Sequence, residues 1–525
     1  MPKETPARIV GALADRGYNA EREAVTLLAN ASDPERALER ALESTPESVL
    51  KLTADHARTA VDATADERGD PAAAVSTPSP DSDPSVSAGN TAAEPPDGGA
   101  NSPVETEGST ETASTRADDG RTGDLRVLTE LEHSTGTGEY RDFVSVFRDR
   151  YEKLARQLRG RVNHRPTDAL EAMPGGSDAA VVGMVADVRS TASGHWLVEL
   201  EDTTGTYPCL VMKDRPIADL VGELLHDEVI AVEGTLSDDN DDGDGILFAD
   251  AIHFPDVPRT HQPSTADREV SAALVSDVHV GSQEFMADAW GRFADWLHTE
   301  EAERVEYLLV AGDMVEGVGV YPDQDEELDI VDIYDQYRAF AEHLKAVPGD
   351  VEIVLIPGNH DAVRLAEPQP PFDEELRDLM SAHDCRIASN PATVDLEGVS
   401  VLMYHGVSLD EVIAELPDET ASYDRPHEAM YQLLKKRHVA PQYGGHTRLA
   451  PESEDHLVIE EVPDVFHAGH VHKFGYGQYH NVLTINSGCW QAQTAFQESV
   501  NIDPDTAMAP ILDLDTLDLT IRKFA

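Results

Sequence analysis

The feature that most constrains this chain is a series of short apolar runs after residue 271, each of which ends at a cluster of Asp, His, Asn or Gly. The clusters that follow the first five runs are Asp277-Val278-His279, Gly312-Asp313, Gly358-Asn359-His360-Asp361, His405-Gly406 and Gly469-His470-Val471-His472. Short strands that alternate with helices are typical of an α/β fold whose site lies beyond the carboxyl ends of the strands. We therefore predict an α/β sandwich that gathers these side chains at one edge.

The residue types in these clusters predict a metal site. In Asp277-x-His279 and His470-x-His472, alternate residues of an extended chain point to the same side, so both members of each pair can reach one site. Glycines at 312, 358, 406 and 469 let the backbone approach and turn beside that site. Carboxylate, imidazole and amide ligands together suit Mn²⁺, Zn²⁺ or Fe and suit Mg²⁺ alone poorly. The alternative is that these are ordinary surface and loop histidines. It would require five independent coincidences at strand ends, so we give it little weight.

The charge balance bears on where such a protein works. The formal net charge is −60, from 100 acidic and 40 basic residues, and only nine of the basic residues are lysine. Acidity can indicate basic partners or adaptation to very high salt. The spread of acid over every segment, with Arg in place of Lys, favours the second. We expect a cytoplasm at molar salt, where the Debye length falls to about 3 Å, and where acidity argues only weakly against binding nucleic acid.

Membrane and disulfide-rich proteins are not expected. No run of about 18 apolar residues is present, so we expect no membrane-spanning helix. The first residues also lack the apolar run of a secretory signal. The three cysteines, Cys209, Cys385 and Cys489, form no CxxC pair, which favours a reducing interior and ordinary core positions.

Composition and periodicity divide the chain into five predicted segments. Residues 71–115 contain no aromatic residue and no Lys, Arg, Leu, Ile or Met, so they cannot bury enough surface to fold and predict a disordered linker. Five strand-like runs between 179 and 256 fit a small barrel such as an OB-fold. The segments are a small helical unit (1–69), the linker (70–125), a helical segment (126–175), the barrel (176–260) and the α/β domain (268–525).

Helical periodicity within 140–159 accompanies a local surplus of basic residues. Between Arg141 and Arg165 there are eight basic and three acidic residues. Two interpretations stay open: a solvated helix face, or a surface that contacts a phosphate backbone or an acidic partner. The N-terminal unit is equally open, since a small bundle and a docking module would show the same apolar spacing.

The ligand series resembles the calcineurin-like metallophosphoesterase superfamily over about 272–500. The resemblance implies one divalent ion held by Asp277, His279, Asp313 and His472, and a second held by Asp313, Asn359, His405 and His470. It also implies that His360 contacts the phosphate or protonates the leaving oxygen. Two such ions, with Mn²⁺ foremost and Zn²⁺, Fe or Mg²⁺ as alternatives, would acidify a bridging water for in-line attack on phosphorus.

The segments around the ligands resemble a narrower family. Segment 359–364 runs on into 366–370, and further matches lie at 435–438 with Tyr443-Gly444, at 449–452 and at 486–491. Over about 125–520 they resemble the small subunits of the archaeal D-family DNA polymerases. The resemblance implies a 3′→5′ exonuclease that proofreads DNA 3′ ends and binds a large polymerising subunit. A scaffold with a vestigial site, and a stand-alone phosphatase or repair nuclease, remain the alternatives.

Several further side chains have two open interpretations each. Arg364 can contact a DNA phosphate or pair with Asp361. The run Lys435, Lys436 and Arg437 can contact DNA or form a solvated helix face. Trp490 and Phe496 can stack on a base or on a partner, or pack in the core.

Overall fold

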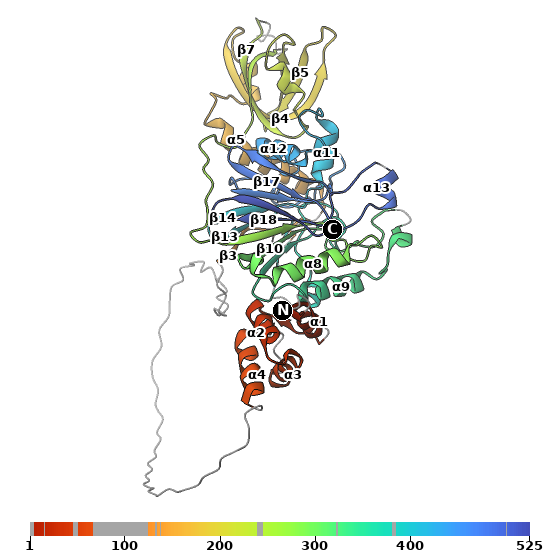
Figure 1. Ribbon diagram of the computed structural model, residues 1–525. Coiled ribbons are helices and arrows are strands. Elements are labelled where there is room, and N and C mark those ends of the chain that lie inside the picture. Colours follow the sequence, from red (N-terminus) through yellow and green to blue (C-terminus); the bar gives the residue numbers. More distant parts are fainter. Residues whose placement is uncertain are drawn as a thin grey trace, which may run out of the picture.

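The structure is a computed structural model of an elongated molecule, with a β-barrel at one end and the N-terminal helices at the other (Figure 1). It describes residues 5–14, 16–45, 51–66, 124–131, 134–136, 138–238, 245–321, 324–380, 385–499 and 501–525. The predicted linker, 70–125, lies outside the described residues except for its last two positions.

Four helices form the N-terminal unit: α1 (Thr5–Ala14), α2 (Arg22–Asn30), α3 (Pro34–Ser44) and α4 (Ala54–Asp66). Helix α3 begins after Asp33, whose side chain accepts a hydrogen bond from the backbone of Arg36, and Pro34 occupies the first turn. The two-residue strands β1 (Asn19–Ala20) and β2 (Lys51–Leu52) pair in parallel. Apolar faces of the helices pack on one another around residues such as Leu13 and Leu28.

Strand β1 attaches this unit to the rest of the molecule. The Asn19 amide donates to the backbone oxygens of Lys345 and Val347 at 3.0 Å each. The backbone N–H of Gly349 donates to the oxygen of Ala20 at 2.8 Å. These bonds join the unit to the turn after helix α9 (Ile333–Lys345).

Strand β3 (Leu125–Thr129) spans the end of the predicted linker and the start of the predicted helical segment, so no strand was predicted there. It pairs antiparallel with β13 (Ala392–Leu396) and so forms the edge of a sheet built almost wholly from the C-terminal half. Leu125 is the one buried residue of its five, and the other four are partly or fully exposed. Such a short segment lacks the regular alternation that would predict a strand from the sequence. Helix α5 (Tyr140–Arg159) confirms the predicted helix at 140–159.

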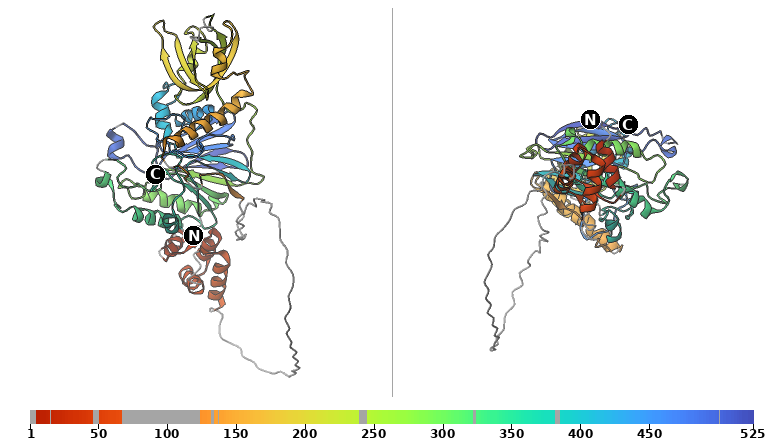
Figure 2. Two further views of the ribbon diagram at one scale, coloured as in Figure 1. Left: turned by 180° about the vertical axis from the view of Figure 1, so that it is seen from behind. Right: turned by 60° about the horizontal axis from the view of Figure 1, so that its bottom comes forward.

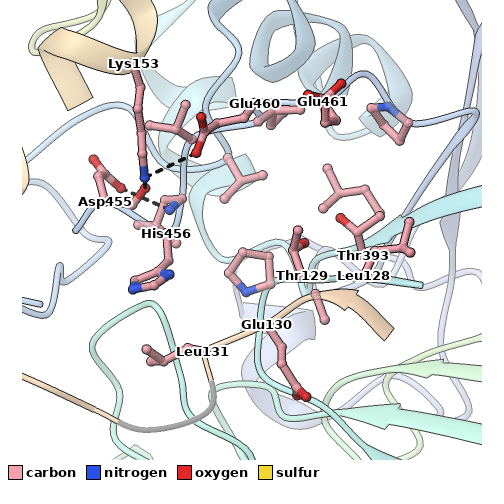
Figure 3. A pocket seen from close by; sticks show the side chains of 18 of the residues that line it. Leu128, Thr129, Glu130, Leu131, Lys153, Thr393, Asp455, His456, Glu460 and Glu461 are labelled. Atoms are coloured by element: carbon pink, nitrogen blue, oxygen red, sulfur yellow. Dashed lines mark hydrogen bonds and ion pairs between the residues drawn. The ribbon is translucent and has the colours of Figure 1, made fainter. Parts of the chain in front are cut away.

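Helix α5 lies between the barrel and the sandwich, which Figure 2 shows from behind. Leu154 and Leu158 pack against barrel strands, while buried Arg150 pairs with Asp455 at 2.7 Å on the sandwich side. Nearby, Lys153 reaches acidic groups at the rim of a cavity of about 250 Å³ (Figure 3). None of the predicted site residues lines that cavity.

The five predicted barrel strands are confirmed. They are β4 (Asp178–Ser190), β5 (Trp196–Glu201), β6 (Thr206–Val211), β7 (Val229–Leu236) and β8 (Leu247–His253). They close in the order β4-β5-β6-β8-β7, and apolar residues that alternate along the strands fill the interior. Residues 239–244, between β7 and β8, lie outside the described residues.

Two six-stranded sheets form the α/β part. The first has the order β12 (Arg386–Ile387), β11 (Glu352–Ile356), β10 (Val305–Ala311), β9 (Ser271–Val275), β18 (Met508–Asp513) and β19 (Asp518–Lys523). The second has the order β16 (Phe474–Tyr479), β17 (Val482–Ser487), β15 (Val465–Ala468), β14 (Val399–Met403), β13 and β3. The predicted apolar runs all correspond to strands of these sheets, namely β9, β10, β11, β14, β15 and β17.

Helices cover the outer faces of the two sheets, so the layers are helix, sheet, sheet and helix (Figure 1). Helices α8 (Ala287–Leu297) and α9 pack on the first sheet, and α11 (Ser408–Glu415) and α12 (Pro426–Lys436) pack on the second. Residues such as Leu309 and Val401 fill the space between the sheets. The shorter helices are α6 (Thr167–Glu171), α7 (Ala218–Val221), α10 (Glu374–Leu379), α13 (Ala495–Ser499), η2 (Glu300–Ala302) and η3 (Gln324–Glu327).

The predicted α/β architecture and a closed small barrel are thus both present. Within the described part of the chain, no helix has the combined length and apolar character that crossing a membrane requires.

Candidate metal centre

The structure brings the predicted ligands together in the loops that follow five strands. Asp277 and His279 follow β9, Asp313 follows β10, Asn359 and His360 follow β11, His405 follows β14, and His470 and His472 follow β15. Strands β9, β10 and β11 run parallel in the first sheet, and β14 and β15 run parallel in the second. Because the sheets pack face to face, the carboxyl ends of these strands meet at one edge.

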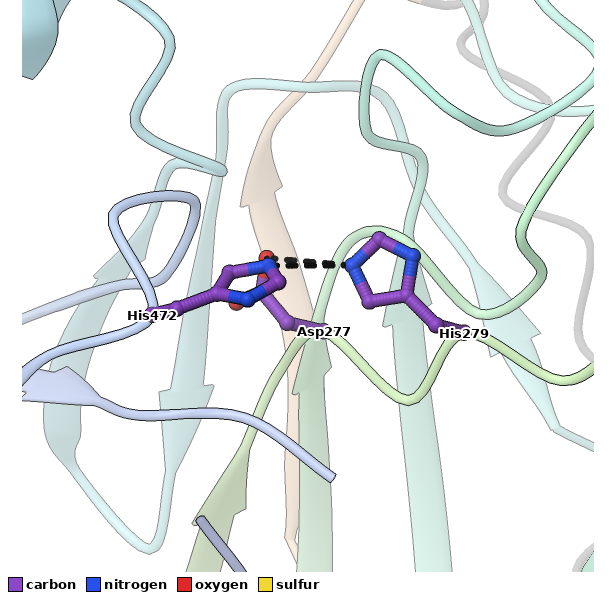
Figure 4. Close-up of side chains that lie close together, drawn as sticks. All are labelled: Asp277, His279 and His472. Carbon is purple, nitrogen blue, oxygen red and sulfur yellow. Dashed lines mark hydrogen bonds and ion pairs between the residues drawn. The ribbon is translucent and has the colours of Figure 1, made fainter. Parts of the chain in front are cut away.

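One group of donors consists of Asp277, His279 and His472 (Figure 4). Their nitrogen and oxygen atoms converge: the two Nε2 atoms are 3.1 Å apart, and Asp277 Oδ1 lies 3.4 Å from His472 and 3.9 Å from His279. All three side chains are buried. Three such atoms around one point form half or more of the shell that a transition metal needs.

A second group surrounds Asp313. Its Oδ2 lies 3.2 Å from Nε2 of His405, and that nitrogen lies 3.0 Å from Oδ1 of Asn359. His470 completes a set with Asp313 and His405 whose donor atoms all lie within 4.8 Å of one another. The same Oδ2 of Asp313 lies 3.8 Å from Nε2 of His279, in the first group. Asp313 therefore stands between the two groups, and the donor chemistry of both fits divalent cations.

The electrostatics of the centre favour positive charge. Burial alone would raise the pKa of Asp313, but the imidazoles of His405, His360 and His279 together outweigh it and keep the pKa well below its usual 3.8. Burial acts to lower the pKa of His405, yet the carboxylates of Asp313 and Asp277, with the backbone oxygen of Ala311, together outweigh that effect and raise the pKa to about 10. A proton on His405 thus balances the buried carboxylate of Asp313, and a bound cation would displace it.

Backbone conformation sets these residues apart. Five of the predicted ligands have positive φ: Asp277 (53°), His279 (57°), Asp313 (52°), His470 (71°) and His472 (53°). Side chains other than glycine adopt this left-handed region rarely, at a cost of about 1–2 kcal/mol each. Such residues persist where the surrounding structure dictates them, and they cluster at functional sites.

Glu316 supports the centre and was not singled out from the sequence. It is 2% exposed, and its Oε2 lies 2.9 Å from Nδ1 of His279. Gln491 donates to the same carboxylate at 2.7 Å. Burial would raise the pKa of Glu316, but His279, His360 and Gln324 together outweigh it and lower the pKa to about 2. Its only sequence signal is its place three residues after Asp313, which no pattern distinguishes from an ordinary loop acid.

The outer nitrogens of other histidines are held in the same way. Nδ1 of His405 lies 2.9 Å from the oxygen of Ala311, which leaves Nε2 for the centre. Gln497 lies 2.8 Å from Nδ1 of His472, and Asp410 lies 3.0 Å from Nε2 of His470. Gln497 and Asp410 were likewise not predicted, because they come from helices α13 and α11 rather than from the strand ends.

His360 lines a cavity of about 160 Å³, which His279, Asp313 and His470 also line. Its Nδ1 lies 2.7 Å from the backbone oxygen of Glu316, and its backbone N–H donates to Asp313 at 2.9 Å. These contacts fix the ring and, among the described residues, leave Nε2 available at the cavity.

The predicted DNA contact is wrong for Lys436 and Arg437. Lys436 is fully buried, and its ammonium donates to the backbone oxygen of Glu223 at 2.9 Å. Arg437 is 4% exposed and donates to the backbone oxygen of Ile459 at 2.8 Å. Both cations serve internal acceptors, so neither side chain is available to a DNA backbone.

Lys435 and Arg364 also have acidic partners within the chain. Lys435 lies 2.7 Å from the carboxylate of Glu223, and Arg364 lies 2.6 Å from that of Glu452. The sequence had suggested Asp361 as the alternative partner of Arg364. Both side chains keep some exposure, and for them a DNA contact stays a prediction.

The two predicted aromatic residues behave differently from each other. Trp490 is 1% exposed and packs edge-on against Trp290 in the core, with ring centroids 5.0 Å apart. Phe496 is 53% exposed. The core interpretation is therefore confirmed for Trp490 and wrong for Phe496.

Comparison with known proteins gives three matches of interest. The model of the family described as the B subunit of DNA polymerase alpha/epsilon matches residues 272–475. A DNA polymerase II small subunit from Halobacterium salinarum is 65% identical over 528 residues, covering 100% of both chains. A protein of the same name from Archaeoglobus fulgidus is 44% identical over 389 residues, covering 72% of this chain and 77% of its own.

Among solved structures, one described as a novel archaeal phosphodiesterase covers 48% of this chain and 99% of its own. Its sequence identity is 14% and its TM-score is 0.24, which is too low to establish a common fold.

Proposed function

Since the chain belongs to the family of archaeal DNA polymerase II small subunits, we propose that it removes nucleotides from DNA 3′ ends as a metal-dependent 3′→5′ exonuclease. The observation that carries this proposal is the position of Asp313. One of its carboxylate oxygens lies 3.2 Å from His405 and 3.8 Å from His279, each in a different donor group. A carboxylate between two donor groups is typical of sites that bind two cations.

Bound cations would supply an acidified water and neutralise phosphate oxygens. Asp277, His279, Asp313 and His472 would hold one of them, and Asp313, Asn359, His405 and His470 the other. The chain's own contribution is to fix these side chains. His360, whose Nδ1 is occupied by the oxygen of Glu316, can present Nε2 to the substrate and protonate the departing 3′-oxygen.

We propose three further assignments: the superfamily, the fold of the barrel and the salt concentration of the cytoplasm. The sandwich with its donor groups supports a place in the calcineurin-like metallophosphoesterase superfamily. The closed five-stranded barrel supports an OB-fold. The net charge of −60 with only nine lysines supports a cytoplasm at molar salt.

The first test is a nuclease assay. Full-length protein, purified with any bound partner at molar salt and supplied with Mn²⁺, should shorten single-stranded and mismatched 3′ ends. We expect His360→Ala to lower kcat by about 100-fold or more, the usual contribution of a general acid. His456→Ala, a histidine outside the centre, is the matched control. Wild-type activity no greater than that of His360→Ala would refute the exonuclease.

The alternative that we keep is a scaffold with an inactive centre. Elemental analysis separates the two, because an exonuclease of this kind should bind about two divalent ions per chain at saturation. A content below one ion per chain would favour the scaffold.

We further propose that the chain binds a large subunit that carries polymerisation. An exposed aromatic groove between α5 and the barrel supports such a partner: Tyr140 is 83% exposed and Tyr443 is 46% exposed. Phe143 and Phe147 pack on Tyr443 at 5.7 and 5.4 Å between ring centroids. Tyr140→Ser with Tyr443→Ser should weaken co-purification of the large subunit at native salt, and unchanged recovery would remove this groove as its binding surface.

A further inference from the structure

We propose that Tyr321 and Phe496 form an aromatic platform that stacks the unpaired terminal base of the DNA 3′ end beside the metal centre. This inference rests on the proposed exonuclease and names the part of the substrate that the centre recognises. It makes the platform, rather than basic side chains, the main source of affinity for the DNA end.

The two rings lie at the mouth of the cavity that contains the predicted catalytic and metal-binding groups. Their centroids are 5.9 Å apart and their planes differ by 23°, so the rings stack on each other nearly in parallel, and a base can extend this stack. The ring of Tyr321 lies 6.4 Å from that of His360. A base stacked on this surface would place its own phosphodiester within reach of the centre.

The hydroxyl of Tyr321 lies between two carboxylates. The hydroxyl oxygen lies 3.2 Å from Glu316 and 3.1 Å from Glu327, and its single proton can be donated to either carboxylate. Glu316 is the carboxylate that also lies beside His279, so one buried residue positions both the platform and a predicted ligand. Rigid aromatic surfaces bind bases well because little side-chain entropy is lost on contact.

Phe496 is anchored through its neighbour in the short helix α13. Gln497 lies 2.8 Å from Nδ1 of His472 and accepts a hydrogen bond from the backbone of Thr494 at 3.1 Å. The backbone of α13 is therefore fixed to the centre, while the Phe496 ring itself is 53% exposed. A large apolar ring that is both anchored and exposed at a polar cavity is available to a ligand.

The lining of the cavity offers few positive charges for DNA phosphates, so another source of affinity is needed. Among the described residues that line the cavity there is no Lys or Arg. Lys436 and Arg437 are buried, and at molar salt phosphate contacts lose most of their strength. Stacking of a base on an aromatic ring contributes about 1–3 kcal/mol, accepts every base and does not depend on screening by salt.

The decisive variant is Phe496→Ala, assayed in the full-length chain at molar salt with Mn²⁺. We expect KM for a single-stranded oligonucleotide to rise about tenfold, which corresponds to the loss of one stacking contact. The activity ratio between the oligonucleotide and one whose 3′-terminal nucleotide lacks its base should fall by a similar factor. Phe496→Trp should restore the ratio. Tyr476→Ala is the matched control, because Tyr476 is 49% exposed and does not line the cavity.

A binding measurement tests the platform without turnover. An oligonucleotide with 2-aminopurine at its 3′ end, added in the absence of metal, should lose fluorescence on wild-type protein because stacking quenches it. Phe496→Ala should leave it bright, and Phe496→Leu, which keeps much of the volume but not the aromatic ring, should do the same. Equal quenching by wild type and both variants would overturn the platform.

The outcomes for the two proposals are separable. Wild-type protein that hydrolyses neither substrate would refute the exonuclease. Wild-type protein that degrades DNA, with an unchanged activity ratio in Phe496→Ala, would refute only the platform.

Discussion

At the scale of single residues, Glu316 connects three parts of the centre: a predicted ligand, Gln491 and the aromatic platform. We expect Glu316→Gln to weaken Mn²⁺ binding by about 10–100-fold, because the charge that orients and polarises His279 is lost. Isothermal titration measures this directly. Glu326→Gln, an exposed carboxylate in the same region, should bind metal as the wild type does. Equal affinities for the two variants would contradict the role given to Glu316.

His438 predicts how stability depends on pH. Its Nδ1 accepts from the backbone of Ala440 at 3.0 Å and its Nε2 lies 3.0 Å from Asp455, so the neutral ring is fully bonded. Burial, followed by the charge of Arg150, lowers its pKa from 6.5 to about 4. Between these two values the unfolded state binds a proton that the folded state does not, so stability falls as pH decreases.

The size of this effect is roughly 3 kcal/mol, from about 1.4 kcal/mol per pKa unit. His438→Gln removes the titration, so its free energy of unfolding should be lower at pH 7 but should fall less between pH 6.5 and about 4. Urea denaturation at molar salt across this range measures the difference. Parallel curves for the two proteins would show that His438 does not cause the loss.

Sequence reasoning located the donors of the centre but not their supports. Asp277 or His405 could be found because strand ends impose a recognisable pattern. Glu316, Asp410 and Gln497 act through contacts between loops and helices that are distant in the sequence, and no local pattern marks them. Lys436 and Arg437 were misjudged for a related reason, since helical spacing does not reveal which face of a helix other segments of the chain cover.

At the scale of elements, strand β3 adds an edge strand to the second sheet and contributes Leu125 to the core. Leu125 is 4% exposed and belongs to the core between the sheets, whereas Leu128 in the same strand is 50% exposed. Leu125→Ala should lower the free energy of unfolding by about 2–4 kcal/mol. Leu128→Ala should change it by no more than about 0.5 kcal/mol. Similar losses in denaturation experiments would show that β3 does not contribute to the core.

The strands with continuous apolar sequences were predictable, and the edge strands were not. Strands β9, β10 and β11 are buried on both faces, so they read as continuous apolar runs. Strands β16 and β19 alternate with exposed residues and lie at sheet edges, where the sequence resembles a loop. Strand β3 joins its sheet from outside the predicted α/β domain, so its place depends on tertiary contact alone.

At the scale of the whole molecule, the contact between the N-terminal unit and the sandwich can be broken at one position. A Cβ atom at Gly349 would lie 2.1 Å from the Asn19 side chain. Gly349→Ala should therefore release the helical unit and speed its removal by a protease, with little change in metal binding. Gly291→Ala is the control, because a Cβ there meets nothing within 4 Å. Identical proteolysis of both variants would contradict the contact.

The left-handed backbone at five predicted ligands affects which residues evolution can favour at these positions. Each such residue costs about 1–2 kcal/mol that glycine would not, so mutation towards glycine is favoured wherever the site is idle. In metal-free protein, His472→Gly should be more stable than His472→Ala by about 1 kcal/mol, as denaturation would show. A lineage that used the fold only as a scaffold would drift to glycine or asparagine there, whereas this chain retains Asp and His at all five positions.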